Sequence, residues 1–246
     1  KAETRDFVSP GDIIELRGRS VRKIKPLAIT LPIVFQDEHL VVADKPGGMA
    51  VNGNRYKTVE NAVADLSGSF LTPGSLSRPV AVHRLDVPTS GLVLLARTKK
   101  AQILLSRAFQ ERRVTKKYLA VVHGKPATRG RISTPIDGKS ALTRFHLIRS
   151  VPSRNFGHLS LLELTPVTGR THQLRIHLRD MGHLIVGDKL YAGQQKTILG
   201  KGLLLCASEL IFEHPITRKN IKLRIDSPAK FTRLMDREAK RYASDE

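Results

Sequence analysis

The chain has 246 residues, 40% of them apolar, which is enough to bury a hydrophobic core and excludes a disordered segment. Lysine and arginine number 42 against 22 acidic residues, and the resulting net charge of +20 is typical of proteins that bind a polyanion. Apolar runs of about half a dozen residues are too short for a membrane-spanning helix. The single cysteine, Cys206, excludes an intramolecular disulfide and favours a cytoplasmic location.

Basic residues gather in three stretches, at 17–25, 99–117 and 218–241. Each stretch alone is compatible with a solvated surface, but together they favour nucleic acid over a membrane, because tryptophan anchors are absent. Eight phenylalanines and four tyrosines are few for a protein that stacks single-stranded bases. We therefore expect phosphate contacts with a folded RNA or a duplex, and specificity at a small pocket.

The first elements in chain order are a turn with a short strand at 7–16 and a basic linker at 17–25. Two apolar runs, 33–35 and 40–43, predict a β-hairpin. Thr58 is suited to cap a helix over about 59–67.

The apolar run at 91–96 predicts a central strand, and Thr98 is expected to cap a helix over about 99–112. Periodicity predicts two further helices, 171–181 and 229–241, and five further strands, 117–123, 141–149, 158–165, 203–213 and 220–225. Strands and helices do not alternate strictly. The pattern therefore predicts an α+β fold with a large mixed, mainly antiparallel sheet flanked by helices.

Motifs for nucleotide binding and for a serine nucleophile are absent from the sequence. His172 and His177 are five residues apart, roughly 140° around a helix, and do not share a metal ion as an i, i+4 pair does. We therefore expect no metal site and no nucleotide cofactor.

Residues 80–91 place His83, Arg84, Asp86, Thr89 and Ser90 between two apolar segments, which is how a sheet presents a reactive group on a loop. The same residues also fit a turn that Asp86 caps, with Arg84 as its surface ion pair.

The helix at 171–181 places His172, Arg175 and Arg179 on one face, opposite an apolar stripe. Such a helix is often simply exposed to solvent. Arg170, just before it, adds a cation beside free backbone N–H groups, which favours an anion there.

These segments carry a resemblance to a known family. His83-Arg84-Leu85-Asp86, followed by Thr89-Ser90-Gly91, resembles the catalytic motif of the RluA family of pseudouridine synthases. Other motifs of that family are matched, in the same order, by residues 44–48, 116–120, 166–177 and 183–191. The resemblance extends from about residue 32 to about residue 227. Cys206, where many members have histidine, is one departure.

The resemblance implies a pseudouridine synthase fold over residues 26–246, preceded at 1–25 by the end of a small RNA-binding domain and a linker. It also implies isomerisation of a uridine in structured RNA, ribosomal or transfer, by a monomer without a cofactor. Asp86 would be the catalytic carboxylate, Arg175 its ion-pair partner, and Tyr118 would pack on the uracil, with a hydroxyl placed to take the C5 proton. The residues expected to contact RNA or substrate are Arg84, Arg170, His172, Lys45, Arg112 and Arg113.

Two other functions remain open from the residues alone. One is a catalytically silent RNA-binding module with the same charge. The other is a glycoside hydrolase or nucleosidase with two carboxylates, which requires a second acid near Asp86, where the nearby motifs supply arginines.

Overall fold

The computed structural model of the chain describes residues 9, 29–69, 74–194, 197–198 and 200–244. The predicted strand at 7–16, the linker at 17–25 and the domain boundary at residue 25 therefore lie outside the described residues, Ser9 apart, and stay predictions. The helices are α1 (Val59–Ala62), α2 (Lys99–Gln110), α3 (Gln173–Asp180) and α4 (Ala229–Ala243), with a 3₁₀ helix at Ala64–Ser69. The strands are β1 (Ile33–Gln36), β2 (Leu40–Lys45), β3 (Ser75–Ala81), β4 (Ser90–Thr98), β5 (Thr115–His123), β6 (Arg129–Ile132), β7 (Thr143–Ser153), β8 (Gly157–Pro166), β9 (Leu205–Glu213) and β10 (Asn220–Arg224).

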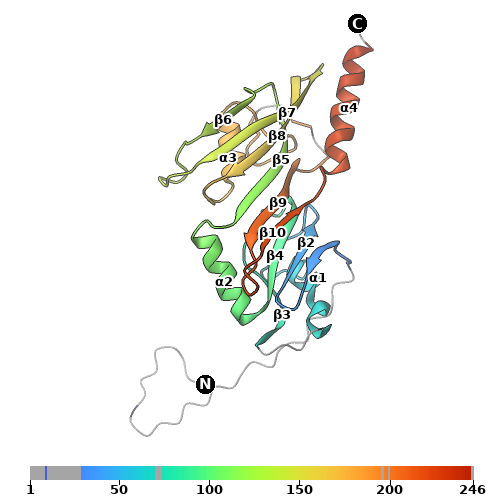
Figure 1. Cartoon of the computed structure of the whole chain (residues 1–246). Helices are drawn as coiled ribbons and strands as arrows, with labels where there is room; N and C mark the ends of the chain where they lie inside the picture. Colours follow the sequence, from blue (N-terminus) through green and yellow to red (C-terminus); the bar gives the residue numbers. More distant parts are fainter. Residues whose placement is uncertain (1–8, 10–28, 70–73, 195–196, 199, 245–246) are drawn as a thin grey trace.

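All ten of these strands belong to one sheet, in the order β1-β2-β4-β9-β5-β8-β7-β6, with β10 beside β9 and β3 beside β4 (Figure 1). Among the described strands, β4 and β9 alone are paired in parallel; the other neighbours are antiparallel. The fold is thus α+β with a mixed, mainly antiparallel sheet, as predicted. No helix in the described ranges is both long and apolar enough to cross a membrane.

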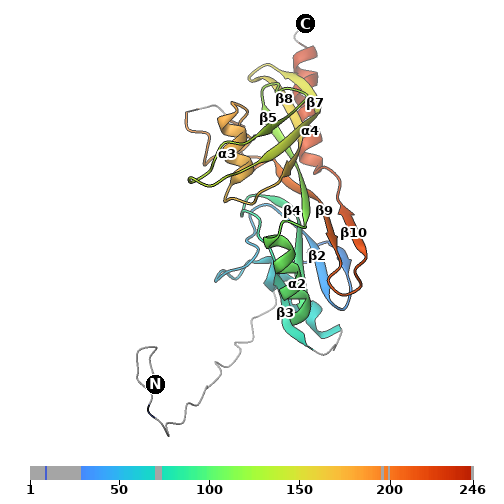
Figure 2. The ribbon, with the colours of Figure 1, turned by 60° about the vertical axis from the view of Figure 1, so that its left-hand side comes forward.

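The helices α3 and α4 cover opposite faces of the sheet. Successive side chains of a strand point to opposite faces, and β5 follows this rule. Ala120 and Val122 pack in the same cluster as Leu174 and Leu178 of α3, whereas Leu119 and Val121 pack with α4 through residues that include Phe231 and Leu234. Both views place α3 and α4 on opposite sides of this part of the sheet (Figures 1 and 2).

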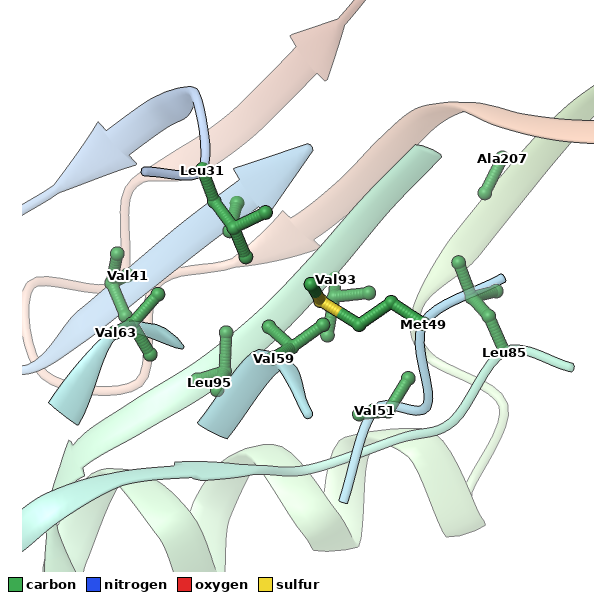
Figure 3. Packing of buried hydrophobic residues seen from close by; sticks show 11 residues of the cluster. Leu31, Val41, Met49, Val51, Val59, Val63, Leu85, Val93, Leu95 and Ala207 are labelled. Atoms are coloured by element: carbon green, nitrogen blue, oxygen red, sulfur yellow. The ribbon is translucent and has the colours of Figure 1, made fainter. Parts of the chain in front are cut away.

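A third apolar cluster packs on one face of the strands β2 and β4 and includes side chains of both. Its members are Leu31, Val41, Ala43, Met49, Val51, Val59, Val63, Leu85, Val93, Leu95 and Ala207. Leu85, which follows β3, lies at the same end of this cluster as Ala207 of β9 (Figure 3). The core therefore reaches into the polar loop that the sequence singled out.

Gly91 lies in the short parallel pairing of β4 with β9, in the middle of the strand order given above. Its φ is +110°, and a Cβ there would collide with the backbone of Ala207. Glycine therefore meets two needs, the positive φ and the close approach of the two strands.

Most predicted elements are confirmed, including the hairpin β1–β2 and the caps Thr58 and Thr98, whose side chains accept hydrogen bonds from Asn61 N and Ala101 N. Three differences are found. Helix α1 ends at Ala62, and α3 begins only at Gln173, because His172 has a left-handed backbone with φ 54°. Strands β3 and β6 were not predicted at all. β3 (SLSRPVA) contains two serines, an arginine and a proline, and β6 (RGRI) contains two arginines and a glycine, so neither has a clear apolar alternation.

Candidate active site

The loop between β3 and β4 is anchored at alternate residues. His83 Nε2 accepts a hydrogen bond from Leu94 N at 3.0 Å, and its ring stacks on Phe109 with centroids 4.6 Å apart. Burial, together with the charge of Lys116, lowers the pKa of His83 to about 3, so the ring is neutral and able to accept this bond. His83 is therefore a structural anchor.

Leu85 is the second anchor, since it is buried in the apolar cluster of Figure 3. Between and beyond these two residues, Arg84 is exposed and Asp86 is half-buried. Thr89 N donates to the main-chain oxygen of Asp86 at 3.0 Å and closes the turn. The alternation of anchored and free side chains fixes the direction of the Asp86 carboxylate.

Asp86 lies near two side chains of the segment 166–177, an arginine and a histidine. Arg175 Nη1 is 3.5 Å from Asp86 Oδ2, and His172 Nε2 is 3.7 Å from Asp86 Oδ1. The Asp86 side chain remains 20% exposed, whereas that of Arg175 is 5% exposed. The predicted ion pair is thus present, but at a distance longer than that of a close ionic hydrogen bond.

Asp188, a residue for which no role was predicted, is the closer partner of Arg175. Arg175 Nε and Nη2 each donate to a different oxygen of Asp188 at 2.7 Å. Asp188 is buried and also accepts from Leu190 N and Tyr191 N. Burial alone would lower the pKa of Arg175, but the hydrogen bonds and charges of Asp188 and Asp86 outweigh it and raise the pKa. The guanidinium is therefore permanently charged and held on one side.

Tyr191 completes this arrangement from above the guanidinium. The centre of the Arg175 guanidinium is 5.0 Å from the centroid of the Tyr191 ring, within the range of a cation–π contact. The Tyr191 hydroxyl is 2.8 Å from His172 Nδ1, and the other nitrogen of that ring faces Asp86. Tyr191 thus contacts both side chains, Arg175 and His172, that flank the carboxylate.

Tyr118, from β5, lines the same space as Asp86. Burial, with smaller contributions from Asp86 and Cys206, raises the pKa of the Tyr118 hydroxyl. The side chain therefore stays a neutral phenol at neutral pH, with an aromatic face and one hydroxyl available to a ligand.

Lys116, two residues before Tyr118, adds a further cation to the space. Its ammonium lies 5.8 Å from the centroid of the Phe109 ring, and burial lowers its pKa. The neighbouring Lys117 is engaged instead with Glu163 at 3.2 Å and Glu209 at 3.7 Å. Of these two lysines, Lys116 is the one that reaches the site.

Lys45 has a different role from the RNA contact that the sequence predicted. Its side chain is fully buried, and its ammonium donates to the carbonyl oxygens of Met49, Pro46 and Val87 at 2.8, 3.0 and 3.1 Å. Burial lowers its pKa to about 8, against the opposing effect of Asp86 and Asp44. Lys45 ties residues 46–49 to the Asp86 loop from inside the protein, so direct contact with RNA is wrong for this structure.

The segment 166–172 is organised by Gln173, the first residue of α3. Its side-chain oxygen accepts from Thr168 Oγ1 at 2.7 Å and from Arg170 N at 3.0 Å. One of the backbone N–H groups at the start of this helix, that of Arg170, is therefore used inside the protein and is not free for an anion. The Arg170 side chain still lines the site, and its Nε donates to Ser140 O at 3.1 Å.

These segments enclose a cavity of about 390 Å³, a size typical of small-molecule sites. Six of the predicted site residues line it, namely Arg84, Asp86, Tyr118, Arg170, His172 and Arg175. Arg112 and Arg113 do not line it but follow Gln110, the last lining residue of α2, and both are exposed. The arrangement combines one accessible carboxylate, several cations and an aromatic face, which suits a nucleotide better than an apolar ligand.

Comparison with known proteins identifies the family of this chain. A family model described as RNA pseudouridylate synthase matches residues 39–180. The dual-specificity RNA pseudouridine synthase RluA of Haemophilus influenzae is 35% identical over 219 residues, which cover 82% of this chain and 95% of that protein. The ribosomal large subunit pseudouridine synthase D of Zymomonas mobilis is 34% identical over 231 residues, covering 83% of this chain and 71% of that protein.

Solved structures lead to the same family. The human RNA pseudouridylate synthase domain containing 4 superposes with a TM-score of 0.66 at 26% sequence identity, over 83% of this chain and 92% of that one. The sequence and fold comparisons therefore show that this chain belongs to the RluA family of RNA pseudouridine synthases, isomerases that convert uridine in RNA to pseudouridine.

Proposed function

We propose that this protein isomerises a uridine in structured ribosomal or transfer RNA, with Asp86 as the catalytic carboxylate acting on a base flipped out of the RNA. The observation that carries the proposal is the position of Asp86. Its carboxylate opens into the cavity, while Arg175, which faces it, is fixed by two hydrogen bonds to Asp188.

Base flipping follows from the shape of the site. A base inside a helical stack is out of reach of a carboxylate at the wall of a cavity, so the uridine has to rotate out to be bound. The aromatic face of Tyr118 supports packing against the uracil, and the exposed Arg84, two residues before Asp86, is placed to fill the gap left in the stack.

The reaction is an isomerisation in which no atom is gained or lost by the nucleotide apart from exchange with solvent. The N1–C1′ bond breaks, the freed uracil rotates, C5 bonds to C1′, and the C5 proton is lost while N1 gains one. Asp86 serves either by attacking the sugar or base or by removing the C2′ proton. Arg175 holds the carboxylate in place and offsets its charge.

The RNA backbone is proposed to run over the basic residues around the cavity mouth. Arg170 and His172 line the cavity, and Arg112 and Arg113 continue the basic surface beyond α2. We also propose that the protein acts as a monomer in the cytoplasm, a compartment in keeping with its single cysteine.

A nucleosidase with two carboxylates fits this site poorly. The other carboxylate that contacts Arg175 is Asp188, which is buried and accepts two hydrogen bonds from that arginine, and this leaves it unable to activate water. A silent RNA-binding module is separated from the proposed enzyme by product formation alone.

The decisive test is Asp86→Asn, which keeps the size and the polar carbonyl but removes the nucleophile and base. We expect the variant to fold, to bind RNA with near-parental affinity, and to release no tritium from C5-labelled uridine in transcripts of ribosomal and transfer RNA. The control is the parent protein in the same assay, with deamidation of the variant excluded by mass. Release by the Asn variant at the parental rate contradicts the role of Asp86, and no release by the parent on any transcript contradicts the function.

A further inference from the structure

A second and larger concave site lies against the last helix. Its volume is about 850 Å³, and it is formed by the outer side of α4 and the turn between β7 and β8. Five basic side chains line it, namely Arg154, Arg233, Arg237, Lys240 and Arg241. None of its lining residues belongs to the candidate active site.

Three of the arginines form a row along α4. Arg233, Arg237 and Arg241 are spaced at i, i+4 and i+8, so they lie on one side of the helix with a cation about every 6 Å along the axis. That repeat is comparable to the distance between successive phosphates of an RNA strand. Such a row is suited to a backbone rather than to one small anion.

The two acidic residues in the groove do not cancel this row. Glu238 is buried, accepts from Ser153 Oγ at 2.9 Å, and lies 3.3 Å from Arg237 and 3.8 Å from Arg241. Asp236 is paired with Arg149 at 2.8 Å. The buried carboxylate therefore orders two of the arginines, and the groove keeps an excess of positive charge.

This groove is on the face of the sheet opposite to the active site. Helix α4 packs on Leu119 and Val121 of β5, whereas α3, which carries Arg175, packs on Ala120 and Val122 (Figures 1 and 2). An RNA helix whose uridine is bound at Asp86 therefore cannot also occupy the α4 groove unless the RNA bends around the edge of the sheet. Helix α4 also lies outside the residues 39–180 matched by the family model.

We propose that the α4 groove is a second RNA-binding site, which holds the phosphate backbone of a segment separate from the one that carries the target uridine. The proposal rests on the proposed RNA substrate. Its chemistry is contact of Arg233, Arg237, Lys240 and Arg241 with phosphate oxygens, without reading of bases. An RNA large enough to reach both faces gains affinity from this groove, and a short stem-loop does not.

The test removes two cations whose loss leaves the fold unchanged. Arg233 and Lys240 are exposed, and neither forms an ion pair with a described residue, so Arg233→Gln combined with Lys240→Gln disturbs no internal contact. We expect the affinity for an RNA duplex of about 24 base pairs to fall roughly tenfold, with the slope of log K against log salt shallower by about 1 to 2. The maximal rate of tritium release at saturating transcript is expected to be unchanged.

The matched control is Lys125→Gln combined with Lys201→Gln, which removes the same charge from exposed positions outside the groove. Equal weakening in both double variants overturns the proposal in favour of a general charge effect. Unchanged duplex affinity in the α4 variant also overturns the proposal. It would mean that the groove does not bind RNA and either binds an acidic protein or is simply exposed to solvent. A parent that binds the duplex but releases no tritium contradicts the proposed catalysis alone.

Discussion

Asp188 holds Arg175 by two 2.7 Å hydrogen bonds, while Asp86 faces the same guanidinium at 3.5 Å. The Asp188 carboxylate is buried and bound to the arginine, whereas the Asp86 carboxylate lines the cavity. Because the guanidinium is fixed from behind, it orients Asp86 without being drawn fully onto it. The division of work between the two aspartates leads to the first two predictions.

Replacement of Asp188 by Asn leaves a buried arginine without its charge partner. Breaking a buried pair in this way costs about 3 to 5 kcal/mol, and we expect that loss in the free energy of unfolding measured with urea. The control is Asp180→Asn, which breaks the exposed pair with Arg179 and is expected to cost less than about 1 kcal/mol. A similar small cost in both variants contradicts the structural role given to Asp188.

Replacement of Arg175 by Met is expected to lower the rate of pseudouridine formation at least about 100-fold, as is typical when one fixed electrostatic group is removed, with little change in RNA affinity. Arg179, one turn further along α3, is exposed and paired with Asp180, so Arg179→Met is expected to be milder. Single-turnover rates and equilibrium binding separate the two effects. Equal rate losses in both variants indicate general electrostatics instead of a specific contact.

Replacement of Tyr118 by Phe removes the hydroxyl and keeps the ring. The hydroxyl is protonated at neutral pH, so it can accept the C5 proton only by releasing its own proton to a second acceptor as it does so. For such a relay we expect RNA affinity to persist and tritium release from C5 to fall by about 10² to 10⁴, the usual contribution of a group that moves a proton. Because burial raises the pKa of Tyr118, its ionisation is absent from the rate profile of the parent between about pH 6 and 9. Parental release by the Phe variant shows that the hydroxyl takes no part.

Lys116 and Lys117 offer a matched pair of adjacent cations. Lys116 lines the cavity, whereas Lys117 is paired with Glu163 and Glu209. If Lys116 binds a phosphate of the bound nucleotide, Lys116→Gln raises KM about tenfold or more, the value of one charged hydrogen bond, and Lys117→Gln leaves KM unchanged. An unchanged KM for Lys116→Gln rules out the phosphate contact.

His83 makes the stability of the protein depend on pH. Its pKa is about 3 in the folded chain and 6.5 as the ordinary value, so the unfolded chain binds the proton first as the pH falls. The contribution of His83 is complete above pH 6.5 and decreases as the pH falls toward 3. At about pH 5 the loss is about 2 kcal/mol. The variant His83→Gln keeps an acceptor for Leu94 N but does not titrate. We therefore expect its free energy of unfolding, measured with urea at about pH 5 and at about pH 7, to lack this loss.

The residues that form the site could be predicted from the sequence because each of its motifs is a continuous stretch of the chain. Asp86, Tyr118 and Arg175 come from three separate segments, yet each lies within a stretch of recognisable residues, and all three line one cavity. The buried Leu85 beside the exposed Arg84 also follows from ordinary patterning.

The interaction partners of these residues could not be predicted from the sequence in the same way. The pairing of Arg175 with Asp188 depends on a loop that returns to α3, and no local periodicity encodes that return. Lys45 was misjudged because lysine in a turn-like stretch is normally exposed. Here a carbonyl 42 residues away, that of Val87, helps to satisfy its ammonium inside the protein.

The anchoring of the Asp86 loop determines which molecule has to deform when enzyme and substrate meet. His83 is bonded to β4, Leu85 is embedded in the core, and Lys45 secures Val87 from below. A loop held at three points has little freedom to move, so in the proposed mechanism the RNA is the partner that distorts, and it supplies the free energy needed to unstack the base. Discrimination among uridines then depends on the local weakness of each RNA site, and loops, bulges and mismatched pairs are expected to be modified ahead of uridines in regular helices.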